Sequence, residues 1–250
     1  TESILMLESG LAEKHWTRVE NRNRDKTYNK YSLEELTAYA PSIDWKAYFE
    51  GAKIPVQSHV VVRQPTFLKA LSEQVEATDL DEWKVYLAFC LFDSMAPLLS
   101  QQFVDAHFNM KLKTLRGIKE NRPRWKRAIS AINGALGEEV GKEYVARHFQ
   151  PEAKTRMRNL VKNLEGAFEA GIDGLEWMTD ATKVEAKKKL ESFESKIGYP
   201  DAWKDYTKLQ VTADDIVGND FRASSFSFDR SINKLGGPID RKEWFMTPQT

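Results

Sequence analysis

The stretch Arg122–Val145, RPRWKRAISAINGALGEEVGKEYV, decides the fold class of this chain. Its apolar residues recur every three or four positions, the period of an amphipathic α-helix, and they predict a helix over 123–148. The stripe consists of Ile129, Ile132, Leu136, Val140 and Tyr144. Glycines at 134, 137 and 141 lie on an adjoining face. Each costs about 1 kcal/mol relative to alanine, so either another backbone packs closely there or the helix simply tolerates them.

The same period predicts further helices on both sides of this one. They cover residues 2–18, 32–40, 44–51, 65–77, 80–110 with a bend near Pro97, 152–173, 180–195 and 212–234. Capping boxes are expected at Ser32 with Glu35, Thr78 with Asp81, and Thr212 with Asp215. Short strands are predicted only at 56–63 and 196–199. The fold class is therefore mainly α, a large multi-helix domain in one body or two lobes, with one or two short β-strands.

The segment Trp83–Leu99 is apolar on nearly all sides, which is typical of a buried helix at the centre of a domain. Cys90 lies within it and is expected to pack as a small hydrophobic residue. Apolar stripes in 152–173 and 180–195 are expected to form the scaffold around this helix.

Composition argues against several classes of protein. Lysine plus arginine equals aspartate plus glutamate at 37 each, so the chain lacks the positive field of a general nucleic-acid binder. No window approaches the roughly 18 apolar residues of a membrane-spanning helix. The single cysteine allows no internal disulfide. The first residues lack the features of a signal peptide and the last, EWFMTPQT, lack a closing signal, so we expect both ends to lie within a longer polypeptide.

No motif for chemistry is complete in the sequence. His15, His59, His107 and His148 are scattered, whereas zinc ligands usually lie within a few residues of each other. The serines at 224, 225 and 227 lack a nucleophile elbow, and no glycine-rich phosphate loop is present because Gly236–Gly237 resembles the stop of a helix. We therefore assign no catalytic and no metal-binding residue, and the substrate-binding residues stay unidentified.

The paired charges are expected to serve structure. Glu138–Glu139 and Asp214–Asp215 point about 100° apart on a helix, which suits helix surfaces and N-termini. The basic run Arg122–Arg127 is expected to start a helix with solvated cations and Trp125 turned to the core, although it also has the composition of a nucleic-acid contact. Lys187–Lys189 is expected to be a solvated face.

Six segments resemble, in the same order, the neprilysin family of zinc metallopeptidases, which includes the endothelin-converting enzymes and the bacterial oligopeptidases of the PepO type. They are VENRNRDKTYNK (Val19–Lys30), VVVRQPTFLKAL (Val60–Leu71), RPRWKRAISAINGALGEEVGKEYV (Arg122–Val145), LEWMTDATKVEAKKKL (Leu175–Leu190), KIGYPD (Lys196–Asp201) and DRKEWFMTPQT (Asp240–Thr250). The last three together are quite specific, and the set covers almost the whole chain.

The resemblance implies two largely helical lobes around a central cavity, with peptide hydrolysis at a zinc ion held by a thermolysin-like lobe. Residues 1–250 match part of the other, noncatalytic lobe, and the family's H-E-x-x-H helix would follow Thr250. The resemblance thus implies zinc in the complete enzyme but none bound by this chain. The partners implied are the catalytic lobe and peptide substrates. Location in the periplasm or outside the cell is implied too, and the single cysteine fits the bacterial branch.

Two alternatives remain open from the sequence. The first is a freestanding helical peptide-binding or adaptor module without catalysis. The second is a nucleic-acid binder that uses Arg122–Arg127, which the zero net charge disfavours.

Overall fold

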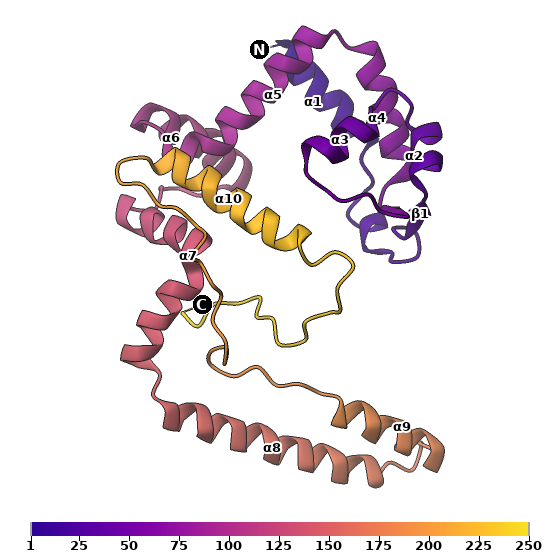
Figure 1. Ribbon diagram of the computed structural model, residues 1–250, viewed down its shortest axis with the longest axis vertical. Coiled ribbons are helices and arrows are strands. Elements are labelled where there is room, and N and C mark those ends of the chain that lie inside the picture. Colours follow the sequence, from indigo (N-terminus) through magenta and orange to yellow (C-terminus); the bar gives the residue numbers. More distant parts are fainter. Residues whose placement is uncertain (1, 250) are drawn as a thin grey trace. The chain divides into compact units, whose positions relative to one another are not determined.

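The computed structural model describes residues 2–249, and the chain divides into two compact units, one ending at Lys119 and the other beginning at Glu120 (Figure 1). Helices dominate both units, so the mainly α fold class is confirmed. Thr250, the last residue of the segment beginning at Asp240, lies outside the described residues.

The first unit begins with helices that pack around one another. Its elements are α1 (Glu2–Lys14), the 3₁₀ turn η1 (Glu20–Arg22), β1 (Asn29–Tyr31), α2 (Leu33–Tyr39), α3 (Trp45–Gly51), β2 (Val60–Val62), α4 (Pro65–Ala77), α5 (Leu80–Met95), η2 (Ala96–Leu98), α6 (Gln101–His107) and η3 (Phe108–Thr114). Helix α1 contacts α4 and α5, and α2 contacts α3 and β1. Leu36 of α2 is 2% exposed and is the largest fully buried apolar side chain among the described residues.

The only sheet in the described part of the chain is a two-stranded antiparallel ribbon. Strand β2 lies inside the predicted segment 56–63, and its residue Val61 pairs with Lys30 of β1. Strand β1 was not predicted, because three residues are too few for an alternating pattern. The strand predicted at 196–199 is wrong, since this segment is irregular and Gly198 has φ of +72°.

The predicted helix 80–110 is broken where Pro97 was expected to bend it. Helix α5 ends at Met95, a 3₁₀ turn contains Pro97, and α6 continues into the π-helix η3. Within residues 2–249 no single helix is long and apolar enough to cross a membrane, although the segments Leu80–Leu98 and Gln101–Thr114 pass that test together with a bend of 108°.

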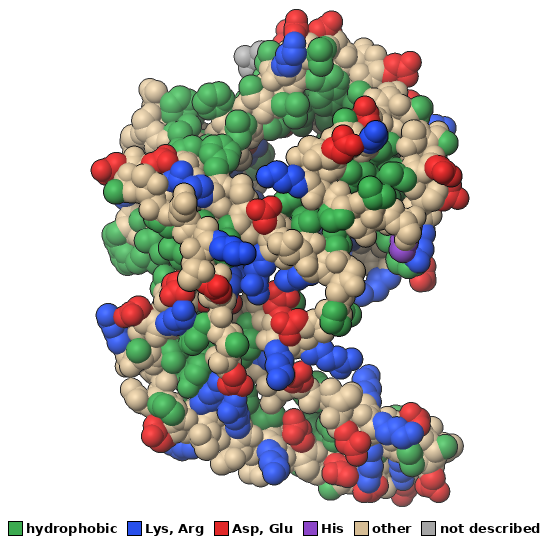
Figure 2. All heavy atoms as spheres, viewed as in Figure 1, with side chains coloured by type: hydrophobic (Ala, Val, Ile, Leu, Met, Phe, Trp, Pro, Cys, Tyr) green, Lys and Arg blue, Asp and Glu red, His purple; other side chains and the backbone are tan. Residues whose placement is uncertain are grey.

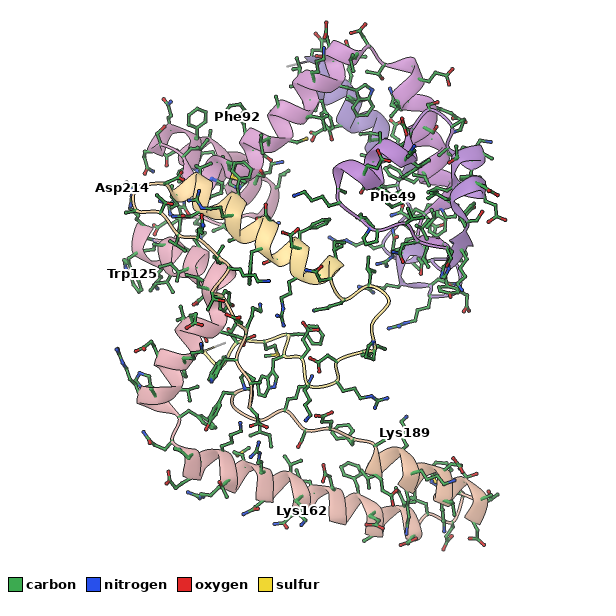
Figure 3. All side chains as sticks on the ribbon, viewed as in Figure 1. Phe49, Phe92, Trp125, Lys162, Lys189 and Asp214 are labelled. Carbon is green, nitrogen blue, oxygen red and sulfur yellow. The ribbon has the colours of Figure 1, made fainter. Side chains whose placement is uncertain are left out.

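The prediction that Trp83–Leu99 is a buried central helix is wrong. No residue of α5 is buried, and Leu87 and Phe92 are 61% and 60% exposed (Phe92 is labelled in Figure 3). Cys90 is half-buried, not enclosed. The helix is apolar on all sides, but the neighbouring elements cover only part of its circumference. Its composition is typical of a buried helix, whereas the described residues leave it partly exposed.

The described residues of the second unit form four helices, and a long irregular segment joins the last two. They are α7 (Arg124–His148), α8 (Pro151–Asp173), α9 (Asp180–Glu191) and α10 (Ile216–Ile232). Helices α8 and α9 lie side by side, and α10 contacts α7 (Figure 1). Helix α7 is kinked at Leu136, whose φ of −127° and ψ of 31° are not helical.

The apolar stripes predicted for these helices form, but they are not the buried scaffold that we expected. Ile129 and Ile132 of α7 are each 48% exposed, and Phe168 of α8 is 66% exposed. Trp125 is 61% exposed, so its predicted place in the core is wrong. Figure 2 shows hydrophobic side chains spread widely over the visible surface. These helices present apolar faces that the other residues within 2–249 leave uncovered.

Capping was predicted correctly at one helix of three. The Ser32 hydroxyl accepts a hydrogen bond from the Glu35 backbone N–H, and the Glu35 carboxylate accepts one from the Ser32 backbone N–H, which makes a complete capping box. Helix α5 is capped by Asp79 instead of Thr78, and α10 by Asp215 instead of Thr212. In both cases a nearby aspartate, whose carboxylate accepts hydrogen bonds from helix N–H groups, takes the place expected for threonine.

Candidate functional site

Helix α10 forms one wall of a cavity in the second unit, and hydrogen bonds join its first turns to the preceding segment. The Asp215 carboxylate accepts a hydrogen bond from the Gly218 backbone at 3.0 Å and one from the Arg222 guanidinium at 2.9 Å. These contacts, Arg222 first, hold the pKa of Asp215 below its usual range. Arg222 also donates to the Gln210 carbonyl, so the segment before α10 is fastened to the helix.

Three cations converge on Glu243 at the other end of α10. The Lys234 ammonium pairs with Oε1 of Glu243, Arg230 lies 3.9 Å from the same oxygen, and Lys196 donates to the Glu243 backbone carbonyl. The Glu243 side chain is 17% exposed and the Arg230 side chain 39%. This cluster holds residues 237–245 against the C-terminal half of α10.

The cavity between these elements has a volume of about 1210 Å³. Its walls are α10, the segment 205–210, Lys196 and the segment 237–245. Phe226 of α10 stacks on Tyr206 with ring centroids 5.6 Å apart, and burial raises the pKa of Tyr206. The site therefore combines aromatic rings with a cluster of positive charges. Sequence analysis missed it, because its residues come from three separate stretches of the chain.

A second cavity of about 510 Å³ lies around the KIGYPD segment. Lys154 of α8 is 6% exposed and donates to the Tyr199 carbonyl at 2.6 Å and the Asp201 carboxylate at 2.9 Å. Its ammonium also lies 3.8 Å from the centre of the Tyr199 ring. The hydrogen bond from Lys154 is the main cause of a lowered pKa of Asp201. We interpret this cluster as structural, because Lys154 is fully used by its neighbours.

The glycine-bearing face of α7 carries the last described residues of the chain. A Cβ atom at Gly141 would lie 2.8 Å from Cδ of Pro248, and one at Gly137 would lie 2.6 Å from Cγ2 of Thr247. The Gln249 amide donates to the Asn133 side chain at 3.1 Å and the Gly137 carbonyl at 2.9 Å. Another segment therefore packs closely at positions 137 and 141, but its nearest atoms belong to side chains and not to the backbone that we expected. Gly134 has no neighbour within 4 Å and fits simple tolerance.

Of three charged residues that were expected to serve structure, one has its predicted role and two do not. Asp215 caps α10, as expected for a carboxylate at a helix N-terminus. Glu138 was expected on a helix surface, but it is 8% exposed and its carboxylate accepts a hydrogen bond from the Lys204 backbone at 2.6 Å. Lys187 was expected in a solvated face, but it pairs with Asp173 at 2.8 Å and joins α9 to α8. Both partners are distant in the sequence, so local patterns could not reveal them.

The histidines lie in separate surroundings. His15 stacks on Phe67 with ring centroids 3.8 Å apart, His107 lies 3.4 Å from Asp93, and His148 contacts Tyr144. Across residues 2–249, no three histidine, cysteine, aspartate or glutamate side chains come together in a group able to hold a metal ion. The described residues therefore do not fit a zinc site.

The described residues form a mainly helical domain without an assembled group of metal ligands. The model for the N-terminal domain of peptidase family M13 matches residues 1–200, so the chain belongs to peptidase family M13. The resemblance to the neprilysin family is thereby confirmed. An endothelin-converting enzyme homologue of Locusta migratoria is 27% identical over all of this chain and 37% of its own length. Human endothelin-converting enzyme 1 is 27% identical over 99% of this chain and 34% of its own length.

Solved structures agree with this membership. Mycobacterium tuberculosis zinc metalloprotease Zmp1 in its open state superposes with a TM-score of 0.91 and 38% identity, over 100% of this chain and 39% of its own length. PepO from Lactobacillus rhamnosis shares the fold, with a TM-score of 0.84 at 22% identity. The chain thus spans less than two fifths of the length of the relatives named here, and it corresponds to part of a larger protein in each of them.

Proposed function

We propose that this chain is the noncatalytic helical lobe of a zinc metalloendopeptidase that hydrolyses short peptides. In this proposal the lobe walls off the cavity of the enzyme and limits the size of substrates that reach the catalytic lobe. Membership of peptidase family M13 supports the general activity. The observation that carries the specific role is the amount of surface that the chain leaves uncovered.

The accessible surface of the chain is 18888 Å². Two separate compact domains, each with half of the chain's mass, would expose about 14,000 Å² together. The excess of roughly 5,000 Å² is as large as the surface that permanent protein interfaces bury. Much of it is apolar, because α5, α7 and α8 all present half-exposed stripes. Such faces fit a lobe that is covered by another part of the same polypeptide.

The uncovered surface also bears on the alternative of a freestanding adaptor module. Monomeric soluble proteins rarely expose contiguous apolar patches larger than a few hundred Å². A module that worked alone would be expected to bury the stripe of α8, in which Met157, Leu160 and Leu164 are each more than 40% exposed. We therefore favour the lobe over the adaptor.

The zinc ligands and the catalytic residues are assigned, in this proposal, to residues outside 1–250. We further propose that the complete enzyme works in the periplasm or outside the cell, which rests on the family resemblance alone. Its partners would be the catalytic lobe and peptide substrates.

A pair of substrates tests the size filter in the complete polypeptide. One is a short quenched fluorescent peptide, and the other is a long unfolded protein that contains the same sequence. We expect cleavage of the short peptide and protection of the long chain. Equal rates on both would contradict the filtering role.

The noncatalytic assignment has its own test. Residues 1–250 expressed alone are expected neither to bind zinc stoichiometrically nor to cleave the peptide. Chelator-sensitive cleavage by this chain alone would refute the assignment.

A further inference from the structure

The cavity beside α10 carries more positive than negative charge. Its cationic residues are Lys196, Lys208, Arg222, Arg230, Lys234 and Arg241, and its acidic residues are Asp205, Asp229, Asp240 and Glu243. Arg222 is already neutralised by Asp215, which lies outside the lining. The remaining lining residues still have a surplus of one positive charge, although the whole chain is neutral.

Three of the cations gather at Glu243. Lys234 and Arg230 approach the same carboxylate oxygen, and Lys196 is used by the backbone carbonyl of that residue. One negative charge therefore faces three cations at the wall of an open cavity. Arg230 is the least engaged of them, because its 3.9 Å separation from Oε1 exceeds a hydrogen-bond distance. A second carboxylate that enters the cavity could therefore pair with cations whose charge Glu243 does not fully neutralise.

Apolar surface lies next to this cluster. Phe245 is 86% exposed and the Lys196 ammonium lies 5.6 Å from the centre of its ring, while Phe221 is 43% exposed. The volume of about 1210 Å³ exceeds that of most sites for small molecules, which span roughly 300–1,000 Å³. These features suit an extended ligand with an anionic group beside an apolar side chain.

The position on the helix favours a carboxylate over a phosphate. Arg230 and Lys234 lie at the C-terminal end of α10, where the helix dipole is negative. Phosphate sites commonly use the opposite end of a helix, where free backbone N–H groups point at the anion. A single negative charge held by side chains tolerates the C-terminal end better than a doubly charged group.

We propose that this cavity binds an acidic peptide, with Arg230 and Lys234 pairing with a carboxylate of the peptide and with Phe221 and Phe245 contacting a neighbouring apolar side chain. The inference rests on the proposed function, because it assigns an acidic preference to the peptide substrates of the same enzyme.

Two peptides that differ only by glutamate or glutamine test the inference in the complete polypeptide. Fluorescence anisotropy gives the affinity for each peptide, and a cleavage assay gives its rate. The variant is R230Q/K234Q, and the matched control is K162Q, which removes an exposed cation from α8 (Lys162 is labelled in Figure 3). We expect the unmodified protein and K162Q to bind the glutamate peptide about tenfold more tightly, a difference that one charge-assisted contact provides. R230Q/K234Q should bind both peptides equally.

A third variant separates charge from folding. Glu243→Gln frees the cations, so it should strengthen binding of the glutamate peptide and leave the glutamine peptide unchanged. Equal affinity of the unmodified protein for both peptides would overturn the inference, as would a preference that survives in R230Q/K234Q. A protein that binds the glutamate peptide selectively but cleaves neither peptide would contradict the proposed function and leave the acidic site standing.

Discussion

Lys154 places a charged group in the interior of the second unit and satisfies it completely. Its ammonium has a backbone carbonyl, a carboxylate and an aromatic face as neighbours. Buried charges are stable only with such partners, so the KIGYPD segment and α8 depend on each other. The feature could not be predicted from the sequence, because lysine in an amphipathic helix usually indicates an exposed position.

Replacing Lys154 by alanine should destabilise the second unit. The loss of hydrogen bonds to a charged donor is expected to cost about 2 kcal/mol in the free energy of unfolding. Urea unfolding measures the change, and Lys162→Ala on the exposed side of the same helix is the control. Equal midpoints for the two variants would show that the buried cluster contributes nothing.

The interaction of Lys154 with Asp201 should also depend on pH. Because the folded pKa of Asp201 is depressed, its contribution to stability is present above the ordinary carboxyl pKa of 3.8 and is lost as pH falls through the lower folded value. Thermal unfolding of the unmodified protein and of Asp201→Asn as a function of pH measures this. The two melting temperatures are expected to converge in acid, and a constant difference would contradict the pairing.

Tyr86 of α5 offers a test at alkaline pH. Partial burial of this half-buried side chain, followed by a hydrogen bond with Cys90, raises the pKa of Tyr86 to about 12. Between about pH 10 and pH 12 the phenol stays protonated in the folded state but ionises in the unfolded chain. Its contribution to folding stability is therefore complete below pH 10 and is lost as pH rises toward about 12. The absorbance difference between the unmodified protein and Tyr86→Phe should titrate near pH 12. A midpoint near pH 10 would contradict the assignment.

At the scale of elements, the sequence predicted what local chemistry determines. The Ser32 capping box and the break near Pro97 depend on residues within a few positions, whereas α10 ends at Ile232, before the stop expected at Gly236–Gly237. Buried faces were predicted less well. The apolar composition of α5 indicates that the helix needs cover, but composition does not reveal whether the cover lies among residues 2–249.

The glycines of α7 allow a matched pair of substitutions. Gly141→Ala places a methyl group against the rigid ring of Pro248, and we expect a cost of about 1–3 kcal/mol. Gly134→Ala meets open space and should instead stabilise the helix by up to about 1 kcal/mol. Urea unfolding distinguishes the signs, and faster proteolysis at 245–249 in Gly141→Ala would show that the segment has left α7. The same sign for both variants would contradict the close packing.

At the scale of the whole molecule, the extent of uncovered apolar surface is the property that the sequence did not show. Residue counts indicated an ordinary globular composition with 41% hydrophobic residues. The structure shows that many of these residues lie on faces without neighbours, and no single-residue pattern contains that information. The resemblance to a family was more informative here than composition, because it implied a missing second lobe.

The surface should be covered in the complete polypeptide. Residues 1–250 alone are expected to bind a fluorescent dye for exposed apolar surface strongly, and the complete polypeptide weakly for its size. In the isolated chain, Leu87→Ala should lower the free energy of unfolding by less than about 0.5 kcal/mol, as surface substitutions do. In the complete polypeptide, where we expect the helix to be covered, the same substitution should cost about 2–5 kcal/mol, as in a core. Equal dye binding per residue in both proteins would contradict the covering.

The attachment of residues 247–249 to α7 has a mechanical consequence. Gln249 is bound to α7 through two hydrogen bonds, and the glycines at 137 and 141 leave room for the side chains of Thr247 and Pro248. A force that pulls on the chain beyond Gln249 would act first on these hydrogen bonds to α7. The irregular segment 233–246 would be extended only after they break. In a single-molecule pulling experiment, this segment is expected to lengthen only after a distinct rupture, and Gln249→Leu should remove that first event.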